Sequence, residues 1–352
     1  MHKLLFLCLL FSGFLQAANA PTNTKGLPNV AIVITGGTIV EVNDPKTGAS
    51  VPAESAEDVL KAVPELKQIA NVTIVPFSNI DSSQMTPAMW AKLSKVVNDL
   101  LKDPKIKGVV VAHGTDTMAE GAYFLDLTIT EKKPVVFVGA MRNASDPHSD
   151  GPPNLIDALA QVVSDKSYDW GVTVTLNNYI NAARFVEKKQ STNVQAFSSG
   201  DKGVRGYVIN QKVFRVNDRP AGQVLPIPET LPRVDIIQDY AGSDGSFVRY
   251  AVDQGAKGII VNGFGSGNVN VEVYNAIVYA ISKGVAVVIT TTVPEGGVFP
   301  FYGTMGGGQT LKEAGAIVSG DLPAAKARLL LMLALPVVKS DHAQLYHYFC
   351  NY

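Results

Sequence analysis

The sequence predicts an α/β fold with two domains, of which the larger, N-terminal one contains a mostly parallel sheet. Short apolar runs bounded by glycine or proline alternate with longer segments of helical spacing, as in Val109–Ala112 followed by Met118–Leu127. This alternation is typical of strand–helix–strand units with right-handed crossovers. A stretch rich in proline and polar residues, 216–232, separates two such series. The length of 352 residues is sufficient for two domains.

Composition and charge exclude several classes of partner. The chain has 46% apolar and 17% charged residues and a formal net charge of -1. These values are typical of a globular protein and give no basic field for nucleic acid, so we expect no nucleic-acid partner. The sequence lacks the G-x-S-x-G, H-E-x-x-H and G-x-x-x-x-G-K-[ST] motifs, and its five histidines are scattered. We therefore expect no metal and no cofactor.

The N-terminus has the pattern of a secretory signal peptide, which we predict over residues 1–20. A basic start precedes the apolar run Leu4–Leu15, and a small-residue cleavage site ends at Ala20, with Ala17 as a competing position. The apolar run is too short to span a bilayer. We expect a periplasmic protein with no membrane contact in its mature form, whose single cysteine, Cys350, excludes an intrachain disulfide.

Residues 27–215 are predicted as the N-terminal domain. Its first strand is Val30–Ile34, an apolar run that leads into threonine and glycine. Residues 38–52 contain turn residues and little periodicity, so we expect a long loop that either acts as a lid or has no fixed structure. Glu57–Val63 has helical spacing, and Val72–Phe77 reads as a second strand before a polar loop.

The central part of this domain continues the alternation. Pro87 suits the first position of a helix that extends to Leu101. Val109–Ala112 is too short and apolar for a helix and is predicted as a buried strand, whereas Met118–Leu127 returns to helical spacing. A further strand and helix are predicted at Pro134–Val138 and Asn154–Val163.

The pattern then changes to short strand-like pieces separated by polar turns. These pieces are Val172–Leu176, Tyr179–Val186 and Gly206–Phe214, and they predict an antiparallel extension of the sheet. The linker 216–232 follows, and residues 233–352 are predicted as a smaller α/β domain. Its expected strands are Val234–Ile237, Gly258–Val261 and Val285–Ile289, and its expected helices are Phe247–Asp253, Val271–Ser282 and Ala324–Leu335.

Two strand ends in the N-terminal domain present threonine after glycine. The first is Thr35–Thr38, and the second is Gly114–Asp116. Ligands in open α/β sheets bind at the carboxyl ends of strands, although such residues more often cap the following helix. A threonine nucleophile needs a neighbouring base, and a desolvated lysine is suitable. Lys188 and Lys189 are the candidates, with ordinary surface lysines as the alternative; His113 directly follows a buried strand and is interpreted as structural.

Several motifs together resemble the bacterial type II L-asparaginases and their glutaminase-asparaginase relatives. They are Thr35–Ile39, His113–Met118, Tyr123–Leu127, Gly139–Arg142 and Asp150–Leu155. The resemblance extends from Leu27 to Tyr352. It implies an asparaginase-like two-domain fold, a homotetramer made of intimate dimers, and hydrolysis of the side-chain amide of L-asparagine to L-aspartate and ammonia.

The resemblance also implies roles for individual residues. Thr38 corresponds to the acylated nucleophile, and Thr115, Asp116 and Lys188 to the group that activates it or relays protons. Asp116 also faces the substrate's α-amino group. The remaining implied contacts are Ser82 with its neighbour Ser83 for the α-carboxylate, Ala140 for the reacting amide, and Ser266 from another subunit.

The sequence departs from the family pattern at three places. No tyrosine occurs between Glu41 and Pro64, where the family's lid usually has one. Ser83 stands where relatives often have Gln or Glu, and Val293–Thr304 has no acidic residue at the strict cross-subunit position, with Glu295 nearby. These departures leave open whether asparagine or glutamine is preferred. A periplasmic amino-acid-binding protein is the alternative from a different class.

Overall fold

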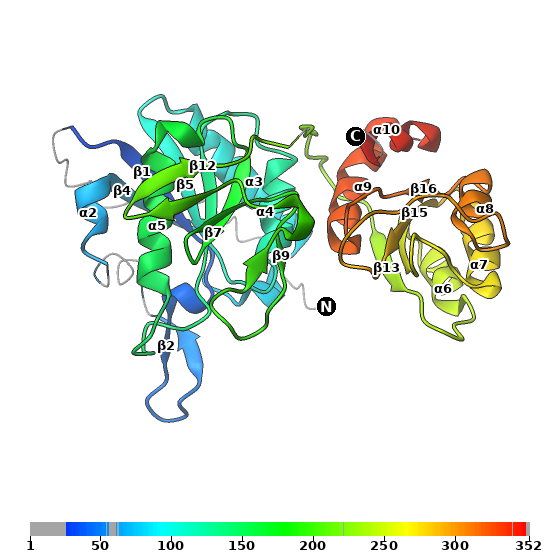
Figure 1. The fold of residues 1–352 in the computed structure, drawn as a ribbon, viewed down its shortest axis with the longest axis horizontal. Coiled ribbons are helices and arrows are strands. Elements are labelled where there is room, and N and C mark those ends of the chain that lie inside the picture. The colour runs from blue at the N-terminus through cyan, green and yellow to red at the C-terminus, as the bar shows by residue number, and fades with distance from the viewer. Residues whose placement is uncertain are drawn as a thin grey trace, which may run out of the picture.

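The computed structural model describes residues 26–53, 55, 61, 63–220, 222–339 and 341–349. The expected signal peptide, most of the helix expected at Glu57–Val63, and Cys350 lie outside these residues. The described chain forms two domains that lie side by side, each with a sheet and covering helices (Figure 1). The predicted α/β class with two domains is therefore confirmed.

An eight-stranded sheet forms the centre of the N-terminal domain. Its order is β12-β11-β8-β7-β6-β5-β1-β4, and the strands from β4 to β7 are parallel while β8, β11 and β12 pair antiparallel. The parallel strands are β1 (Asn29–Ile34), β4 (Asn71–Pro76), β5 (Ile106–Ala112), β6 (Val135–Val138) and β7 (Val172–Leu176). The antiparallel strands are β8 (Tyr179–Ala182), β11 (Gly206–Ile209) and β12 (Lys212–Arg215). This order confirms both the parallel sheet and its antiparallel extension.

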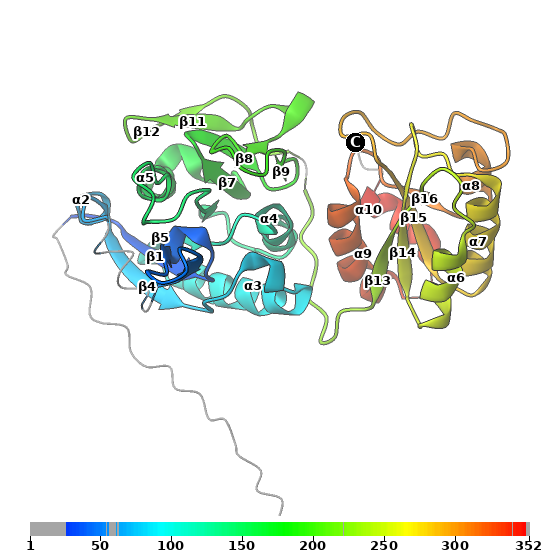
Figure 2. The ribbon, with the colours of Figure 1, turned by 90° about the horizontal axis from the view of Figure 1, so that it is seen from below.

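Helices cover both faces of this sheet (Figure 2). Because successive side chains of a strand point to opposite faces, Val30 and Ile32 of β1 pack on one side while Ala31 and Val33 pack on the other. The first side is covered by α5 (Gly151–Val163) and α2 (Leu66–Ile69), and the second by α3 (Pro87–Lys102) and α4 (Met118–Asp126).

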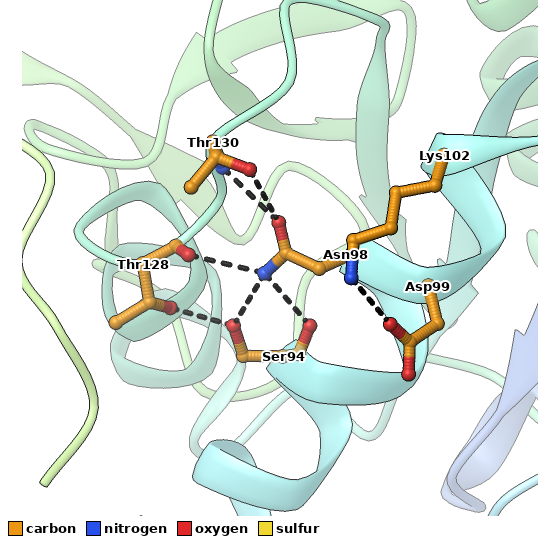
Figure 3. Close-up of polar contacts among 6 residues, drawn as sticks. All are labelled: Ser94, Asn98, Asp99, Lys102, Thr128 and Thr130. Atoms are coloured by element: carbon orange, nitrogen blue, oxygen red, sulfur yellow. Dashed lines mark hydrogen bonds and ion pairs between the residues drawn. The ribbon is translucent and has the colours of Figure 1, made fainter.

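A polar network fixes α3 against the segment that follows α4 (Figure 3). The amide of Asn98 donates to the carbonyl of Thr128 at 3.1 Å and accepts from the backbone of Thr130 at 3.1 Å. The hydroxyls of Ser94 and Thr128 lie 2.7 Å apart. Since buried polar groups are costly without partners, this network sets where α4 ends and therefore supports the helix that begins at the central strand-end loop.

The C-terminal domain contains a four-stranded parallel sheet of order β13-β14-β15-β16. Its strands are β13 (Val234–Gln238), β14 (Gly258–Gly263), β15 (Ala286–Thr291) and β16 (Ile317–Val318). Its helices are α6 (Ser246–Asp253), α7 (Val271–Ser282), α8 (Gly308–Glu313), α9 (Ala324–Val338) and α10 (Tyr346–Phe349). Apolar residues of α9 and α4 belong to one continuous core, so α9 joins the two domains.

Some predicted elements need correction. Residues 38–52 are not an irregular loop: a 3-10 turn at Thr38–Val40 leads into an antiparallel hairpin of β2 (Glu41–Asn43) and β3 (Ser50–Pro52). The expected single strand at Gly206–Phe214 is two strands, because Asn210 and Gln211 adopt positive φ and turn the chain. β8 ends at Ala182, whose carbonyl accepts two backbone bonds from the turn that follows. The described residues from 216 to 233 contain no helix or strand, and the domain boundaries stay a prediction.

No helix in the described ranges is long and apolar enough to cross a membrane.

Candidate active site

The loops after β1, β4 and β5 meet at the carboxyl edge of the N-terminal sheet through glycine contacts. A Cβ on Gly37, whose φ is +85°, would lie 2.3 Å from the Cα of Gly114. A Cβ on Gly36, whose φ is +117°, would lie 2.4 Å from the carbonyl oxygen of Ile80. Only glycine permits both the conformation and this close approach. Thr38 therefore begins its 3-10 turn directly beside the loop that contains Thr115.

Lys188 contacts the two polar side chains of the loop after β5. Its Nζ donates to Thr115 Oγ1 at 2.9 Å and to Asp116 Oδ1 at 2.7 Å. Thr115 is buried, Lys188 has 20% of its side chain exposed, and Asp116 has 64% exposed. The Thr115 hydroxyl and the Lys188 amine are therefore close enough for a proton to pass between them. The arrangement combines a buried hydroxyl, an amine and an open carboxylate.

Lys188 lies on β9 (Glu187–Lys188), a two-residue strand outside the main sheet that pairs with β10 (Phe197–Ser198). The alternation of side chains along this segment turns Lys188 toward Thr115. Glu187 and Lys189 line a cavity of about 300 Å³ between the two domains instead. Of the two lysines that the sequence singles out, the structure brings Lys188 to the threonine.

The two serines after β4 differ in their surroundings. Ser82 is 4% exposed, and its Oγ accepts from the backbone N–H of Asp116 at 3.1 Å. Thr117 Oγ1 donates to the Ser82 carbonyl at 2.8 Å, so two bonds fix Ser82 to the loop after β5. Ser83 is exposed and lies 3.4 Å from the amide of Gln84. The structure thus places Ser82, but not Ser83, in direct contact with the threonine loop.

The turn after β6 contains Ala140, which is buried, and a carboxylate holds its shape. Asp150 accepts from the backbone N–H groups of Met141 at 3.0 Å and Arg142 at 2.8 Å. Asn154 donates to Asp150 at 3.0 Å and to the Gly139 carbonyl at 3.0 Å. The sequence identified the motif Asp150–Leu155 but did not predict that the Asp150 carboxylate holds this turn. Its position just before a Gly-Pro-Pro helix start was the available signal.

His113 is fully buried and has a structural environment. Its Nδ1 lies 2.7 Å from the carbonyl oxygen of Gly114, which can only accept, so Nδ1 carries the proton. Its Nε2 then accepts from Trp90 Nε1 at 3.4 Å. Burial lowers the pKa of His113 to about 4, against the opposing effect of the Gly114 hydrogen bond. The imidazole is therefore neutral and holds the strand end in place.

Two family models match nearly the whole described chain. The model described as Asparaginase, N-terminal, matches residues 29–221, and the model described as Glutaminase/Asparaginase C-terminal domain matches residues 233–349. The chain belongs to the asparaginase family. It is therefore an amidohydrolase and not an amino-acid-binding protein.

Individual relatives span the same length. A probable periplasmic L-asparaginase from Haemophilus influenzae is 37% identical, over 95% of this chain and 95% of the relative. L-asparaginase 2 of Escherichia coli is 37% identical, over 98% of both chains. The crystal structure of a probable cytoplasmic L-asparaginase from Campylobacter jejuni has a TM-score of 0.84 and 37% identity, covering 92% of this chain and all of that one. The two-domain asparaginase fold is confirmed by this match.

The hairpin of β2 and β3, which includes the segment where we expected a lid, docks on the segment after the Ala140 turn. Asn143 donates to Asn43 Oδ1 at 2.6 Å and to Ser50 Oγ at 2.9 Å. Ser145 accepts from the Asn43 backbone at 2.9 Å. Ser50 also donates to the buried Glu41 at 2.6 Å. Polar contacts therefore anchor the described part of this hairpin.

The remaining candidates belong to the C-terminal domain, and among the described residues neither has a hydrogen bond to the threonine cluster. Ser266 lies in the loop after β14, and among the described residues its buried hydroxyl has no hydrogen-bond partner. Glu295 lines the interdomain cavity, and its carboxylate packs against Gly200 of the same chain. Within the described part of the chain, no group of three or more His, Cys, Asp or Glu residues is arranged to hold a metal ion.

Proposed function

We propose that this chain hydrolyses the side-chain amide of L-asparagine to L-aspartate and ammonia through an ester on Thr38. The single observation that supports it is the contact of Lys188 with Thr115 and Asp116, beside a loop that glycine contacts hold next to Thr38. A hydroxyl nucleophile requires an adjacent proton acceptor, and this cluster supplies one. The relatives from three bacteria that bear the name L-asparaginase support the same substrate.

The reaction proceeds in two halves. Thr38 Oγ attacks the carboxamide carbon, and its proton passes through the Thr115 hydroxyl to the amine of Lys188, which gives one of its own protons to the carboxylate of Asp116. The tetrahedral intermediate then breaks its C–N bond, and the nitrogen leaves as ammonia with the proton returned from Asp116 through Lys188. Water attacks the resulting ester, restores the Thr38 hydroxyl and releases aspartate. Preorganised N–H groups stabilise the oxyanion in both halves, a role we assign to the turn at Ala140.

The polar groups around this cluster suit an amino-acid zwitterion. Asp116 is open on one side and is proposed to bind the α-amino group. Ser82 is held against the backbone of Asp116 and is proposed, with Ser83, to bind the α-carboxylate. One fixed anion and several hydroxyl donors are what such a ligand requires.

L-glutamine is the second candidate substrate. The C-terminal family model bears the description Glutaminase/Asparaginase, and the lid region lacks the expected tyrosine. Without a tyrosine in this segment, we propose that the longer side chain of glutamine also fits. The enzyme would then be a glutaminase-asparaginase with comparable or greater activity on glutamine.

Ammonia release from the two amides tests the function directly. We expect saturable release from L-asparagine by the purified protein, and the ratio of kcat/KM for the two amides decides the preference. Acid quenching after mixing with L-asparagine should leave a β-aspartyl ester on the peptide that contains Thr38. An ester on the Thr115 peptide would reverse the two roles, and no release from either amide would overturn the proposal.

We further propose that the enzyme is exported and assembles as a homotetramer in which Ser266 contacts the site of a partner subunit. The signal pattern at residues 1–20 and the periplasmic relative support export, although the Campylobacter jejuni protein is described as cytoplasmic. Periplasmic fractionation with N-terminal sequencing tests the first point. Size-exclusion chromatography with light scattering tests the homotetramer, and a monomer with full activity would contradict it.

A further inference from the structure

A buried lysine of the C-terminal domain contacts the backbone of the N-terminal domain. Lys326 lies in the first turn of α9 and is 2% exposed. Its Nζ donates to the carbonyl oxygens of Arg184 at 2.9 Å and Val186 at 2.6 Å. A fully buried lysine is rare and must be compensated by such contacts. The two carbonyls therefore explain how the ammonium is accommodated, but not why a charged group is used there.

The position of these carbonyls gives the reason. Val186 immediately precedes β9, and the second residue of β9 is Lys188, whose amine contacts Thr115. β9 pairs only with the short β10 among the described strands, so the main sheet does not hold it. The segment needs another support if the Lys188 amine is to stay within hydrogen-bond distance of the threonine.

We propose that Lys326 is a positioning residue, through which the C-terminal domain holds the 184–186 backbone so that Lys188 reaches Thr115. This inference rests on the proposed function, because it assigns Lys326 to the same reaction. Lys326 donates to the carbonyls of Arg184 and Val186 and to no threonine, so it acts through the backbone.

A second contact between the domains supports the same attachment. Arg184 Nη2 pairs with Asp321 Oδ1 at 2.6 Å, and both side chains are mostly buried. Asp321 precedes α9, so it belongs to the same C-terminal segment as Lys326. Asp321 binds the side chain of Arg184, and Lys326 binds the carbonyls of Arg184 and Val186. These contacts on Arg184 and Val186 restrict both the position and the rotation of the backbone that enters β9.

The charges around Lys326 match this arrangement. Burial lowers the pKa of Lys326 to about 7, and the carboxylate of Glu187 opposes that effect most strongly. The ring of Tyr123 on α4 lies under the ammonium, with its centroid 5.8 Å from Nζ. An apolar residue of equal volume would cost less to bury, so the lysine is retained for the geometry of the carbonyls that it binds.

The test compares Lys326→Met with Arg328→Met. Arg328 lies two residues along the same helix and also donates to a backbone carbonyl, that of Val234 at 2.9 Å, but within its own domain. We expect Lys326→Met to lower kcat on the order of 10²-fold, as small misplacements of catalytic groups do, while KM changes less. Arg328→Met should lose thermal stability but keep kcat. Asp321→Asn should lower kcat in the same direction by a smaller factor.

A second measurement does not depend on turnover. Brief acetylation followed by fragment mass spectrometry reports how protected the Lys188 amine is in each folded variant. We expect faster modification of Lys188 in Lys326→Met than in the parent or in Arg328→Met, with the neighbouring Lys189 as internal reference. Equal kcat and equal Lys188 protection in the two methionine variants would overturn the positioning role. A parent protein that releases no ammonia would overturn the proposed function instead, and the acetylation result would still judge the positioning.

Discussion

The carboxyl ends of the parallel strands have opposite character in the two domains. In the N-terminal domain, Gly37 packs on the backbone of Gly114, and polar side chains gather around this contact. In the C-terminal domain, a Cβ on Gly267 would lie 2.4 Å from a methyl group of Val298. Close approach at a strand end is thus used once to join two polar loops and once to pack a loop on an apolar side chain.

The surfaces near these two contacts also differ, because one is polar and the other is apolar. The N-terminal edge presents the open carboxylate of Asp116. The segment after β15 presents exposed apolar side chains, which are those of Phe299, Phe301, Tyr302 and Met305. The comparison teaches that a parallel sheet edge only brings loops together. The chemistry proposed at the N-terminal edge further depends on Lys188, which comes to it from a segment outside the main sheet.

The largest effect is expected from removing the hydroxyl that Lys188 contacts. Thr115→Val keeps the shape of the side chain but removes the hydroxyl that would carry the proton to the amine, which keeps Asp116 as its partner, so kcat should fall on the order of 10³-fold, as for other residues that act as a unit in catalysis. Steady-state ammonia release measures it. Thr130→Val is the matched control, since the Thr130 hydroxyl donates to Asn98 of α3 and not to a residue of the site, so this variant should keep its kcat.

A smaller loss is expected from separating the two N-terminal loops. Gly37→Ala forces a Cβ into the backbone of Gly114, so kcat/KM should fall on the order of 10²-fold through misplacement of Thr38. Gly242→Ala is the control in the loop after β13, with a φ of +87° and no atom within 4 Å of the added Cβ. It should cost about 1 kcal/mol from conformation alone, measured by urea unfolding, and keep its activity. Equal losses in both variants would mean that strain, not the contact, matters.

The strand ends of the N-terminal domain and several helices could be predicted from the sequence because their signals are local. Apolar runs that end in glycine and threonine identify the strand ends, and the bounds of α7 agree with the helical spacing of Val271–Ser282. His113 reads as structural because it directly follows a buried strand, and its two hydrogen bonds agree with that interpretation. The catalytic and binding roles of the threonines stay predictions, although the structure brings Thr115 and Lys188 together.

Other features depend on contacts between distant segments, which no local pattern reports. The lid hairpin has too few residues per strand to show alternation, and its position depends on Asn143. The turn at Asn210 and Gln211 lacks the glycine that usually identifies a hairpin. Lys326 stands at the start of an apolar helix, where a lysine is normally solvated, and only the docking of the two domains buries it.

The smallest effect concerns stability, through the histidine that supports the N-terminal edge. The pKa of His113 is about 4 in the folded protein and 6.5 in its ordinary environment. Between these values the unfolded chain binds more protons than the folded one, so acid favours unfolding. Protonation would also set an Nε2–H against the N–H of Trp90, which explains why the folded state resists it.

We therefore expect the free energy of unfolding to fall by about 2 kcal/mol between pH 7 and pH 5 on account of His113. His113→Gln, which keeps one donor and one acceptor, should show a correspondingly shallower pH dependence in urea titrations. Asp157, whose pKa burial raises to about 6, acts in the opposite direction over this range, and Lys326 contributes near pH 7. Both groups are present in the parent and the variant, so the difference between the two curves isolates His113. Parallel curves would show that the imidazole is already protonated or exposed, and the N-terminal edge would then owe its shape to its glycine contacts alone.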